Sequence, residues 1–432
     1  MKKITPNLIK KTLLDSVDQL LLDRAKYLVE PKKSVSRTQK ITFRDSMIFP
    51  MIIASESTAV EMLDFFPVSK LPSQAAMSYR RDQIKLLAFK DLFSSFTSKI
   101  SHDKTFRGMR LLACDGTRLN TPYNPKDEES FVNCIDGRKG FNQYHLNACY
   151  DILNDLYVDA VIQGYHSMNE KLALCEMMDR FPKDQPALFT ADRGYDSYNV
   201  IAHAINNKHH FVIRLTSSKA LNIFDDIEEY DKKDTFDIED DIFIGRVRNA
   251  ESRKLRNYHF IRYNQNYDFI PAGSIGFDRF HVRMVKFSLP GGESEYLITD
   301  LPGSKFNISD MKEIYRLRWG IETSYRFLKY VSGVNCIHSL RQDFIFQEIY
   351  AKLISYNFSS AIMKCIHLSA SEKNKHNYEL EKTYLMKICI RYLKGKLDDI
   401  YLLTAKRKVP VRVDRKFGRI IRRQHADTLQ YR

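Results

Sequence analysis

Apolar residues recur at helical spacing through the first hundred residues. The first predicted helix follows steps of three and four residues, and its apolar positions are Leu8, Leu13, Leu14, Val17, Leu20 and Leu21. A second helix is predicted over residues 43–54. Ser57 and Thr58, with Glu61 shortly after them, have the form of a capped start for a helix over residues 59–66.

Pro72 opens a further predicted helix over residues 73–96, which contains Arg80 and Arg81. Short helices followed by a basic helix are typical of a helix-turn-helix, which reads DNA. A helical lid that packs on the next domain explains the same pattern equally well. The pattern predicts a helical region and leaves its role open.

From residue 108 the pattern changes to alternating strands and helices. Short apolar runs predict strands, and amphipathic runs predict helices. The predicted order is strands at 109–114, 144–150 and 155–162, a helix at 166–181, a strand at 187–191, a helix at 197–207 and a strand at 211–215. This order predicts an α/β fold in which helices cover a mixed sheet.

The next ninety residues alternate between short apolar and polar segments, which predicts a β-rich insertion. Its strands are expected at 241–247, 259–263, 281–289 and 295–299, and Gly291-Gly292 suits a hairpin between the last two. Later helices are expected at 307–331, 344–367 and 382–393. The chain then divides into a helical region (1–105), the first part of an α/β core (106–215), the β-rich insertion (216–303), a core helix (304–335) and a helical C-terminal region with a basic tail (336–432).

The predicted helix over residues 307–331 carries two stripes. Spacings of three, four and seven residues place four polar side chains on one side, and these are Tyr315, Arg318, Glu322 and Lys329. The apolar stripe is rotated by about 100° and consists of Met311, Ile314, Leu317, Ile321 and Leu328. We expect the apolar stripe to enter a core, so that the polar stripe faces a cleft.

Two aspartates follow strand-like runs upstream of that helix. Asp115 stands in Leu-Leu-Ala-Cys-Asp-Gly-Thr, and Asp192 stands in Leu-Phe-Thr-Ala-Asp-Arg-Gly-Tyr. Ligands generally bind beyond the carboxyl ends of such strands, where Glu322 would add a third carboxylate. Mg²⁺ prefers carboxylate oxygens, and two ions about 3.5–4 Å apart suit the cleavage of a phosphodiester.

These residues also have simpler structural interpretations. Asp115 and the glycine after it could form a turn, and Asp192 could cap the next helix or pair with Arg193. Arg318 and Glu322 could form only an exposed ion pair worth a few tenths of a kcal/mol, while the lysine of the stripe extends to solvent. A purely structural explanation requires all of these interpretations to be true at once. Even then, it does not explain why four polar side chains share one side of the helix.

The charge of the chain suits a polyanionic partner, because the formal net charge is +15 over 432 residues. Nine Lys or Arg and one Asp fall within 406–423, a segment that is either a solvated tail or a DNA contact. Ten acidic residues fall within 225–241, which we expect to be a solvated edge rather than a metal site. The chain has no apolar run of 18 residues, no signal peptide pattern and an odd number of cysteines, seven, so we expect a cytosolic protein without a disulfide framework.

The segment Tyr-Arg-Leu-Arg-Trp-Gly-Ile-Glu-Thr-Ser-Tyr-Arg-Phe-Leu-Lys, residues 315–329, resembles a known signature. This signature is the Tyr-x2-Arg-x3-Glu-x6-Lys pattern of bacterial insertion-sequence transposases, in the insertion-sequence-four family of the DDE group. The contexts of the two aspartates and the β-rich insertion are also similar to that family. The resemblance spans roughly residues 108–329.

The resemblance implies a ribonuclease-H-like catalytic core with a β-rich insertion, flanked by helical N- and C-terminal regions. It implies that Asp115, Asp192 and Glu322 are catalytic and hold two Mg²⁺ ions, for which Mn²⁺ can substitute. The side chains expected to contact transposon-end DNA are Tyr315, Arg318, Trp319, Lys329 and Arg193. Trp319 could stack on an unpaired base, although a partly buried position in the core is favoured for it.

The implied reaction is cut-and-paste transposition of double-stranded DNA by a homodimer that holds both transposon ends in a synaptic complex. We expect residues 1–105 to read the terminal inverted repeats in a bacterial, nucleoid-associated setting. Further phosphate or protomer contacts are expected from Arg412, Arg415, Lys416, Arg419, Arg422 and Arg423. The alternatives are a nuclease that does not join, a DNA-binding regulator with a decayed site, and a small-phosphate hydrolase, which leaves the net charge unused.

Overall fold

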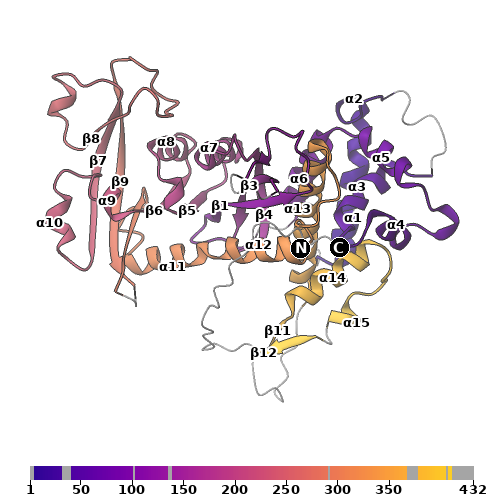
Figure 1. Cartoon of the computed structure of the whole chain (residues 1–432). Helices are drawn as coiled ribbons and strands as arrows, with labels where there is room; N and C mark the ends of the chain where they lie inside the picture. Colours follow the sequence, from indigo (N-terminus) through magenta and orange to yellow (C-terminus); the bar gives the residue numbers. More distant parts are fainter. Residues whose placement is uncertain are drawn as a thin grey trace.

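A single mixed sheet runs through the molecule (Figure 1). The computed structural model describes residues 4–31, 40–100, 103–134, 139–289, 292–366, 378–404 and 407–410. In this part of the chain ten strands form the sheet, in the order β2-β3-β1-β5-β6-β10-β9-β7-β8, with β4 paired to β3. Their bounds are β1 Arg110–Thr121, β2 Phe131–Val132, β3 Phe141–Asp151, β4 Leu156–Gly164, β5 Ala187–Ala191, β6 His210–Leu215, β7 Phe236–Gly245, β8 Tyr258–Phe260, β9 Phe277–Ser288 and β10 Ser294–Thr299.

The centre of the sheet is parallel and its flanks are largely antiparallel. β1, β5 and β6 run in one direction, whereas β3 pairs with β1 and β10 pairs with β6 in the opposite sense. The predicted mixed α/β sheet is therefore confirmed. The strands between residues 216 and 303 do not form a separate sheet, because β10, β9 and β7 continue the central one outward from β6.

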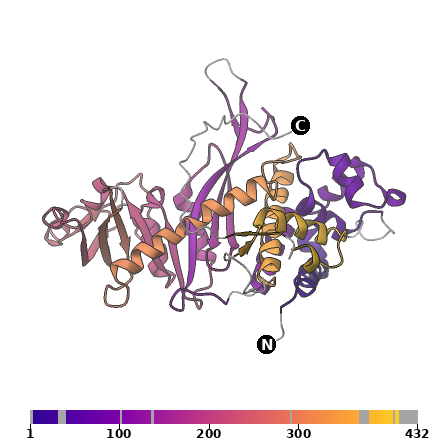
Figure 2. The same cartoon turned by 90° about the horizontal axis from the view of Figure 1, so that it is seen from below.

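Helices cover the two faces of the sheet (Figures 1 and 2). One face carries α7 (Glu170–Arg180) and α8 (Tyr198–Asn206), and the other carries α11 (Ile308–Arg318) and α12 (Gly320–Tyr330). Each layer has its own apolar core, since Leu174 and Val200 pack in one cluster and Met311 and Ile314 in another. Two short helices near the outer strands are α9 (Ser217–Ala220) and α10 (Ile227–Asp231).

The N-terminal helices pack around the long helix α13 (Gln342–Lys364) at the end of the sheet that carries β4 (Figure 1). Leu13 and Phe89 share one apolar core with Tyr157 of β4 and with Leu353 of α13. The helices of this region are α1 Pro6–Leu20, α2 Arg24–Tyr27, α3 Phe43–Ile52, α4 Thr58–Phe65, α5 Gln74–Asp82 and α6 Leu86–Lys99. The C-terminal elements are β11 Tyr378–Leu380, α14 Lys382–Leu393, α15 Tyr401–Thr404 and β12 Lys408–Pro410.

The predicted helix over residues 73–96 is wrong, because the structure breaks it into α5 and α6. Residues 83–85 leave the helix to bond the backbone at residues 27–29: Val29 N donates to Gln83 O at 3.0 Å, and Lys85 N donates to Tyr27 O at 2.9 Å. This backbone pairing replaces the helical hydrogen bonds.

Arg81 is buried rather than displayed on a basic surface. Its Nη1 lies 2.9 Å from Oε1 of Glu348 on α13, and both side chains are almost fully enclosed. The predicted cap at the start of α4 is also wrong, because no side chain there makes a capping hydrogen bond. The carboxylate of Glu61 accepts a hydrogen bond from the backbone amide of Ala54 at 2.7 Å. These contacts match those of a helical lid packed on its neighbour. The basic tail beyond residue 410 lies outside the described residues.

No helix in the described ranges is long and apolar enough to cross a membrane.

Candidate active site

Asp115 and Asp192 lie side by side on neighbouring parallel strands. In the register of β1 and β5, Cys114 pairs with Ala191, and each aspartate is the next residue of its chain. Asp192 directly follows β5, where its carboxylate accepts a hydrogen bond from the amide of Gly194 at 2.8 Å. The register of the sheet therefore brings together two carboxylates that are 77 positions apart in the chain.

The alternative in which Asp115 and Gly116 form a turn is wrong. β1 continues straight through both residues, and they pair with Ala148 and Asn147 of β3. The long neighbouring strand satisfies backbone groups that a turn would otherwise have to satisfy locally.

Both aspartates project toward α11 and α12. Residues two or four apart on a strand share one face, and Leu111 and Leu188 lie four residues before the two aspartates. Both leucines are buried in the same core as Met311 of α11. The carboxylates consequently stand at the end of the layer that these helices cover, where both aspartates are half-buried.

The predicted helix over residues 307–331 is two helices that follow one line (Figure 2). The side chains of Asn307 and Asp310 form a capping box at its start. Trp319 interrupts the assigned helix for one residue but keeps helical backbone angles, φ −55° and ψ −15°. The helix can therefore still present its polar stripe toward the sheet.

Two hydrogen bonds attach α12 to β1. The hydroxyl of Tyr325 donates to the backbone carbonyl of Asp115 at 2.6 Å, and Nζ of Lys329 donates to the carbonyl of Arg118 at 2.9 Å. Glu322 lies three residues before Tyr325 and therefore on the same side of the helix. All three predicted acidic residues accordingly lie at one end of the sheet.

The pKa of the Asp115 carboxyl depends on burial and on the charges of its neighbours. Burial raises the pKa of its carboxyl to about 7, and the Gly116 amide opposes this increase. The negative charges of Asp192 and Glu322 raise the pKa further, whereas the positive charge of Arg318 lowers it. Asp192 and Glu322 thus lie close enough to Asp115 to affect its ionisation.

Arg318 and Tyr315 are buried beside the carboxylates, with only 7% and 8% of each residue exposed. Nη2 of Arg318 lies 3.2 Å from Oε1 of Glu322, and its guanidinium lies 5.3 Å from the ring centre of Tyr315. The alternative of a fully exposed ion pair is wrong for the arginine. In this position its positive charge partly neutralises the three carboxylates of Asp115, Asp192 and Glu322, which are called the acidic group below.

Lys329, Trp319 and Arg193 border this site. Burial lowers the pKa of Lys329 to about 8, although the charge of Asp115 raises it. Trp319 is 43% exposed, so the favoured interpretation of a partly buried core tryptophan is wrong. Arg193 is exposed directly after Asp192.

Sequence reasoning missed Arg214 and Glu295. Ala191 of β5 pairs with Ile213 of β6, so Arg214 continues the row that contains Asp192. Nη2 of Arg214 lies 3.4 Å from Oε1 of Glu295 on β10. A strand was predicted at each position, but local sequence patterns predict neither the pairing nor the register of the two strands.

Sequence reasoning also missed a polar group behind the aspartates. Oε1 of Glu170, at the start of α7, lies 2.8 Å from Nε2 of His145. A Cβ on Gly116 would lie 2.2 Å from that nitrogen and 2.4 Å from that oxygen. The glycine after Asp115 is therefore required by close packing and not by a turn.

The donor set suits a hard divalent cation, because carboxylate oxygens are the preferred ligands of Mg²⁺. In the part of the chain that the structure describes, no three His, Cys, Asp or Glu side chains stand close enough to hold one ion together.

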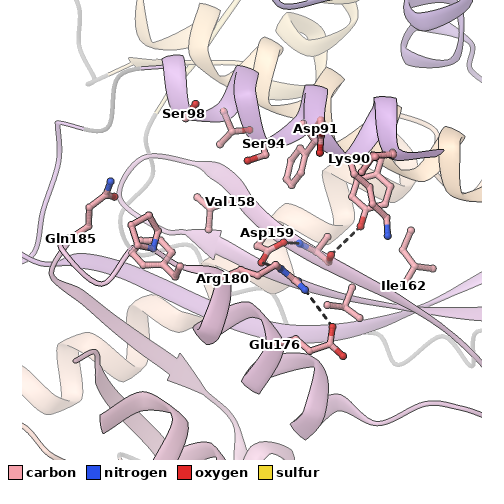
Figure 3. A pocket seen from close by; sticks show the side chains of 18 of the residues that line it. Lys90, Asp91, Ser94, Ser98, Val158, Asp159, Ile162, Glu176, Arg180 and Gln185 are labelled. Carbon is pink, nitrogen blue, oxygen red and sulfur yellow. Dashed lines mark hydrogen bonds and ion pairs between the residues drawn. The ribbon is translucent and has the colours of Figure 1, made fainter. Parts of the chain in front are cut away.

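A cavity of about 790 Å³ lies elsewhere, between α6, β4 and α7 (Figure 3). Arg180 on its wall pairs with Asp159 at 2.9 Å and with Glu176 at 3.3 Å. None of its lining residues belongs to the acidic group. The cavity therefore adds nothing to the candidate site.

A family model described as the transposase DDE domain matches residues 106–358. This match covers more than half of the chain and contains all three acidic residues. The chain belongs to the DDE transposases. It is accordingly an enzyme of DNA transposition.

The synaptic complex of piggyBac transposase with hairpin DNA, determined by cryo-electron microscopy, matches with a TM-score of 0.46 and 13% sequence identity. The match covers 91% of this chain and 80% of the piggyBac chain. The comparison with curated proteins finds no match.

Proposed function

We propose that this transposase belongs to the insertion-sequence-four family and moves an insertion sequence by cut-and-paste transposition. The observation that carries the proposal is the register of β1 and β5, which sets Asp115 beside Asp192 under the helix that carries Glu322. The Tyr-x2-Arg-x3-Glu-x6-Lys pattern of that helix supports the family assignment. A ribonuclease-H-like topology for residues 106–215 belongs to the same proposal.

Asp115, Asp192 and Glu322 would hold two Mg²⁺ ions, which Mn²⁺ can replace. Bound ions supply charge neutralisation at the phosphate and activation of the attacking oxygen. In the first step, an oxygen of water attacks phosphorus at the transposon end, and the bond to the 3′ oxygen breaks. In the second step, the freed 3′-hydroxyl attacks a phosphodiester of the other strand or of the target DNA. A new P–O bond forms, and the bond from that phosphorus to its 3′ oxygen breaks, which leaves a 3′-hydroxyl on the attacked strand.

The remaining signature residues would bind the DNA. Lys329 provides a point charge next to Asp115, and Arg193 provides an exposed guanidinium next to Asp192. Trp319, because it is exposed, offers a face on which a base can stack. Tyr315 and Arg318 are buried, so in this proposal they contact DNA only at the floor of the site.

Both transposon ends must be processed together, so the proposed assembly is a homodimer on two DNA ends. In this proposal residues 1–105 bind the terminal inverted repeats, and the net charge of +15 strengthens binding to the phosphate backbone. The terminal repeats are the short inverted sequences that flank the gene.

To test this proposal, the purified protein is incubated with Mg²⁺, with DNA that carries the flanking inverted repeats, and with a target plasmid. We expect free 3′-hydroxyl ends followed by joined products, and no products with Asp115→Asn. Cleavage without joining would support the nuclease alternative, and binding without cleavage would support the regulator. Either result contradicts the proposal.

A further inference from the structure

The carboxylate of Glu170 lies against two glycines at the candidate site, Gly116 and Gly194. A Cβ on Gly116 would lie 2.4 Å from Oε1 of Glu170, and a Cβ on Gly194 would lie 3.5 Å from Oε2 of the same side chain. Only a residue without a Cβ lets a neighbour come as close as it does at Gly116. One side chain at the start of α7 therefore lies beside the backbone that closely follows each of the two strand-borne aspartates.

The amides of these two glycines orient the aspartates. Gly116 N donates a hydrogen bond to Oδ1 of Asp115 at 2.9 Å. In the same way, Gly194 N donates to Oδ1 of Asp192 at 2.8 Å. Because a hydrogen bond depends on distance and angle, a carboxylate that accepts from an amide follows the peptide that carries it. The positions of the two glycine peptides consequently set the direction of both carboxylates.

The start of α7 is held both to the sheet and to the turn after β5. Asn169 N donates to Oε1 of Gln163 on β4 at 3.0 Å, and the side chain of Asn169 caps the helix. Nζ of Lys171 donates to the backbone carbonyl of Asp196 at 2.6 Å. Glu170 stands between these two residues, so its backbone is fixed on both sides.

His145 of β3 contacts the side chain of Glu170. Its Nε2 lies 2.8 Å from Oε1 of Glu170, and the same nitrogen would lie 2.2 Å from a Cβ on Gly116. His145 is buried, whereas Glu170 is half-buried. The imidazole therefore limits the directions that the glutamate can take and keeps its carboxylate against Gly116.

Two simpler roles do not account for this placement. A carboxylate in the first turn of a helix is stabilised by the helix dipole, but that effect requires no contact with Gly116. A role as a ligand of the proposed metal ions disagrees with the geometry of β1, because successive residues of a strand project to opposite faces. Asp115 projects toward α11 and α12. Glu170 lies on the side to which a Cβ of Gly116 would point, and thus behind the strand.

We infer that Glu170 is a positioning residue of the candidate site. It holds the peptides of Gly116 and Gly194 in the places from which their amides orient the two aspartates. This inference deepens the proposed function and rests on it. Glu170 acts through the backbone and touches none of the reacting atoms.

The first measurement is hydrogen exchange in the metal-free and DNA-free protein, followed by mass spectrometry. Glu170→Ala removes the carboxylate, so we expect the segments that contain Gly116 and Gly194 to exchange about threefold faster or more. Glu170→Gln keeps the shape and an oxygen acceptor, and it should exchange like the unaltered protein. Glu176→Ala makes the same truncation at an exposed position of α7 and should leave both segments unchanged.

The second measurement is the single-turnover rate at which the protein cleaves end DNA with Mg²⁺. We expect this rate to be about tenfold lower in Glu170→Ala, because small displacements of catalytic groups are costly. The dissociation constant for DNA should stay unchanged, since the substitution removes no group that contacts DNA in the proposal. Glu170→Gln should retain most of the rate, and the melting temperature of each variant shows that it has folded.

Two results overturn the inference. In the first, exchange and cleavage in Glu170→Ala match those in Glu176→Ala. In the second, Glu170→Gln loses as much of the cleavage rate as Glu170→Ala, because the charge of the glutamate and not its packing would then be required.

The same assays distinguish this failure from failure of the proposed function. Cleavage that Asp115→Asn abolishes, but that Glu170→Ala leaves unchanged, contradicts only the role of Glu170. If the unaltered protein cleaves no end DNA, the proposed function is wrong, and the inference is wrong with it even where hydrogen exchange changes as expected.

Discussion

The phenol of Tyr325 donates a hydrogen bond to the backbone carbonyl of Asp115, with 2.6 Å between the two oxygens. This contact joins α12 to β1 at Asp115, one of the three proposed catalytic acids. Tyr325 is buried, and it lies three residues after Glu322. The hydrogen bond therefore sets how far the helix-borne carboxylate stands from the strand-borne one.

Replacement of Tyr325 by Phe should remove this hydrogen bond and leave the ring packing in place. We expect a loss of about 1–2 kcal/mol in the free energy of unfolding, because a buried carbonyl loses its donor. Cleavage of end DNA should fall about tenfold or more, since small displacements of catalytic groups are costly. Tyr330→Phe, at the exposed end of the same helix, is the control. Equal cleavage by the Tyr325 variant and the control would show that α12 is positioned by other contacts.

Glu322→Gln should abolish cleavage and leave DNA binding intact. The substitution keeps the shape of the side chain but removes the charge that a divalent ion needs, so we expect at least about a hundredfold loss of cleavage rate. Glu313→Gln makes the same change on an exposed turn of α11 and should have no effect. Electrophoretic mobility shift and cleavage assays on the same DNA provide the two measurements. Normal cleavage by the Glu322 variant would remove this residue from the catalytic group.

Gly116→Ala should destabilise the protein even though the backbone is an ordinary strand. The added methyl group would lie 2.2 Å from Nε2 of His145 and 2.4 Å from Oε1 of Glu170, two atoms that are themselves in contact at 2.8 Å. We expect a loss of about 1–3 kcal/mol, as for other overpacked positions. Urea unfolding measures the loss. An unchanged midpoint would mean that the Glu170 side chain moves aside freely.

The sequence predicted those parts of the fold that depend on local pattern. The strand at residues 187–191 and the helix at residues 382–393 have the predicted bounds, because a short, mainly apolar run and an amphipathic period leave few alternatives. The course of β1 beyond Asp115 could not be predicted in this way. Its polar Asp-Gly-Thr segment is held straight by β3, whose pairing register no local pattern encodes.

The candidate acids were found because two of them follow strand-like runs and the third lies on the polar stripe of a helix, in contexts that resemble those of a family. Their supporting residues have no such pattern or context. Arg214 and Glu295 become neighbours only through the pairing of β6 with β10, and the sequence separates them by 81 positions. The sequence placed Arg81 in a predicted basic helix over residues 73–96, which is typical of a helix-turn-helix. Its burial depends on Glu348, which lies 267 positions further along the chain.

The ion pair between Arg81 and Glu348 makes stability depend on pH in a defined direction. Burial alone would raise the pKa of Glu348, but the charges of Arg81 and His338 bring it down to about 2. The folded pKa lies below the ordinary value of about 4.3, so the stabilising contribution is complete above that value. It is lost as the pH falls from about 4.3 toward 2, and its size is roughly 3 kcal/mol.

The free energy of unfolding, measured with urea, should therefore differ more between the unaltered protein and Glu348→Gln at pH 7 than at pH 3. At pH 7 the variant should be less stable by about 3–5 kcal/mol, because Arg81 keeps a buried charge without its partner. At pH 3 this difference in the free energy of unfolding should be smaller. The pH then lies below the ordinary pKa of a glutamate, so keeping Glu348 ionised in the folded protein costs free energy. Arg44→Ala breaks an exposed pair with Asp18 and should cost less than about 1 kcal/mol at pH 7. A gap that stays constant between the two pH values would show that Glu348 gains no stability from its charge.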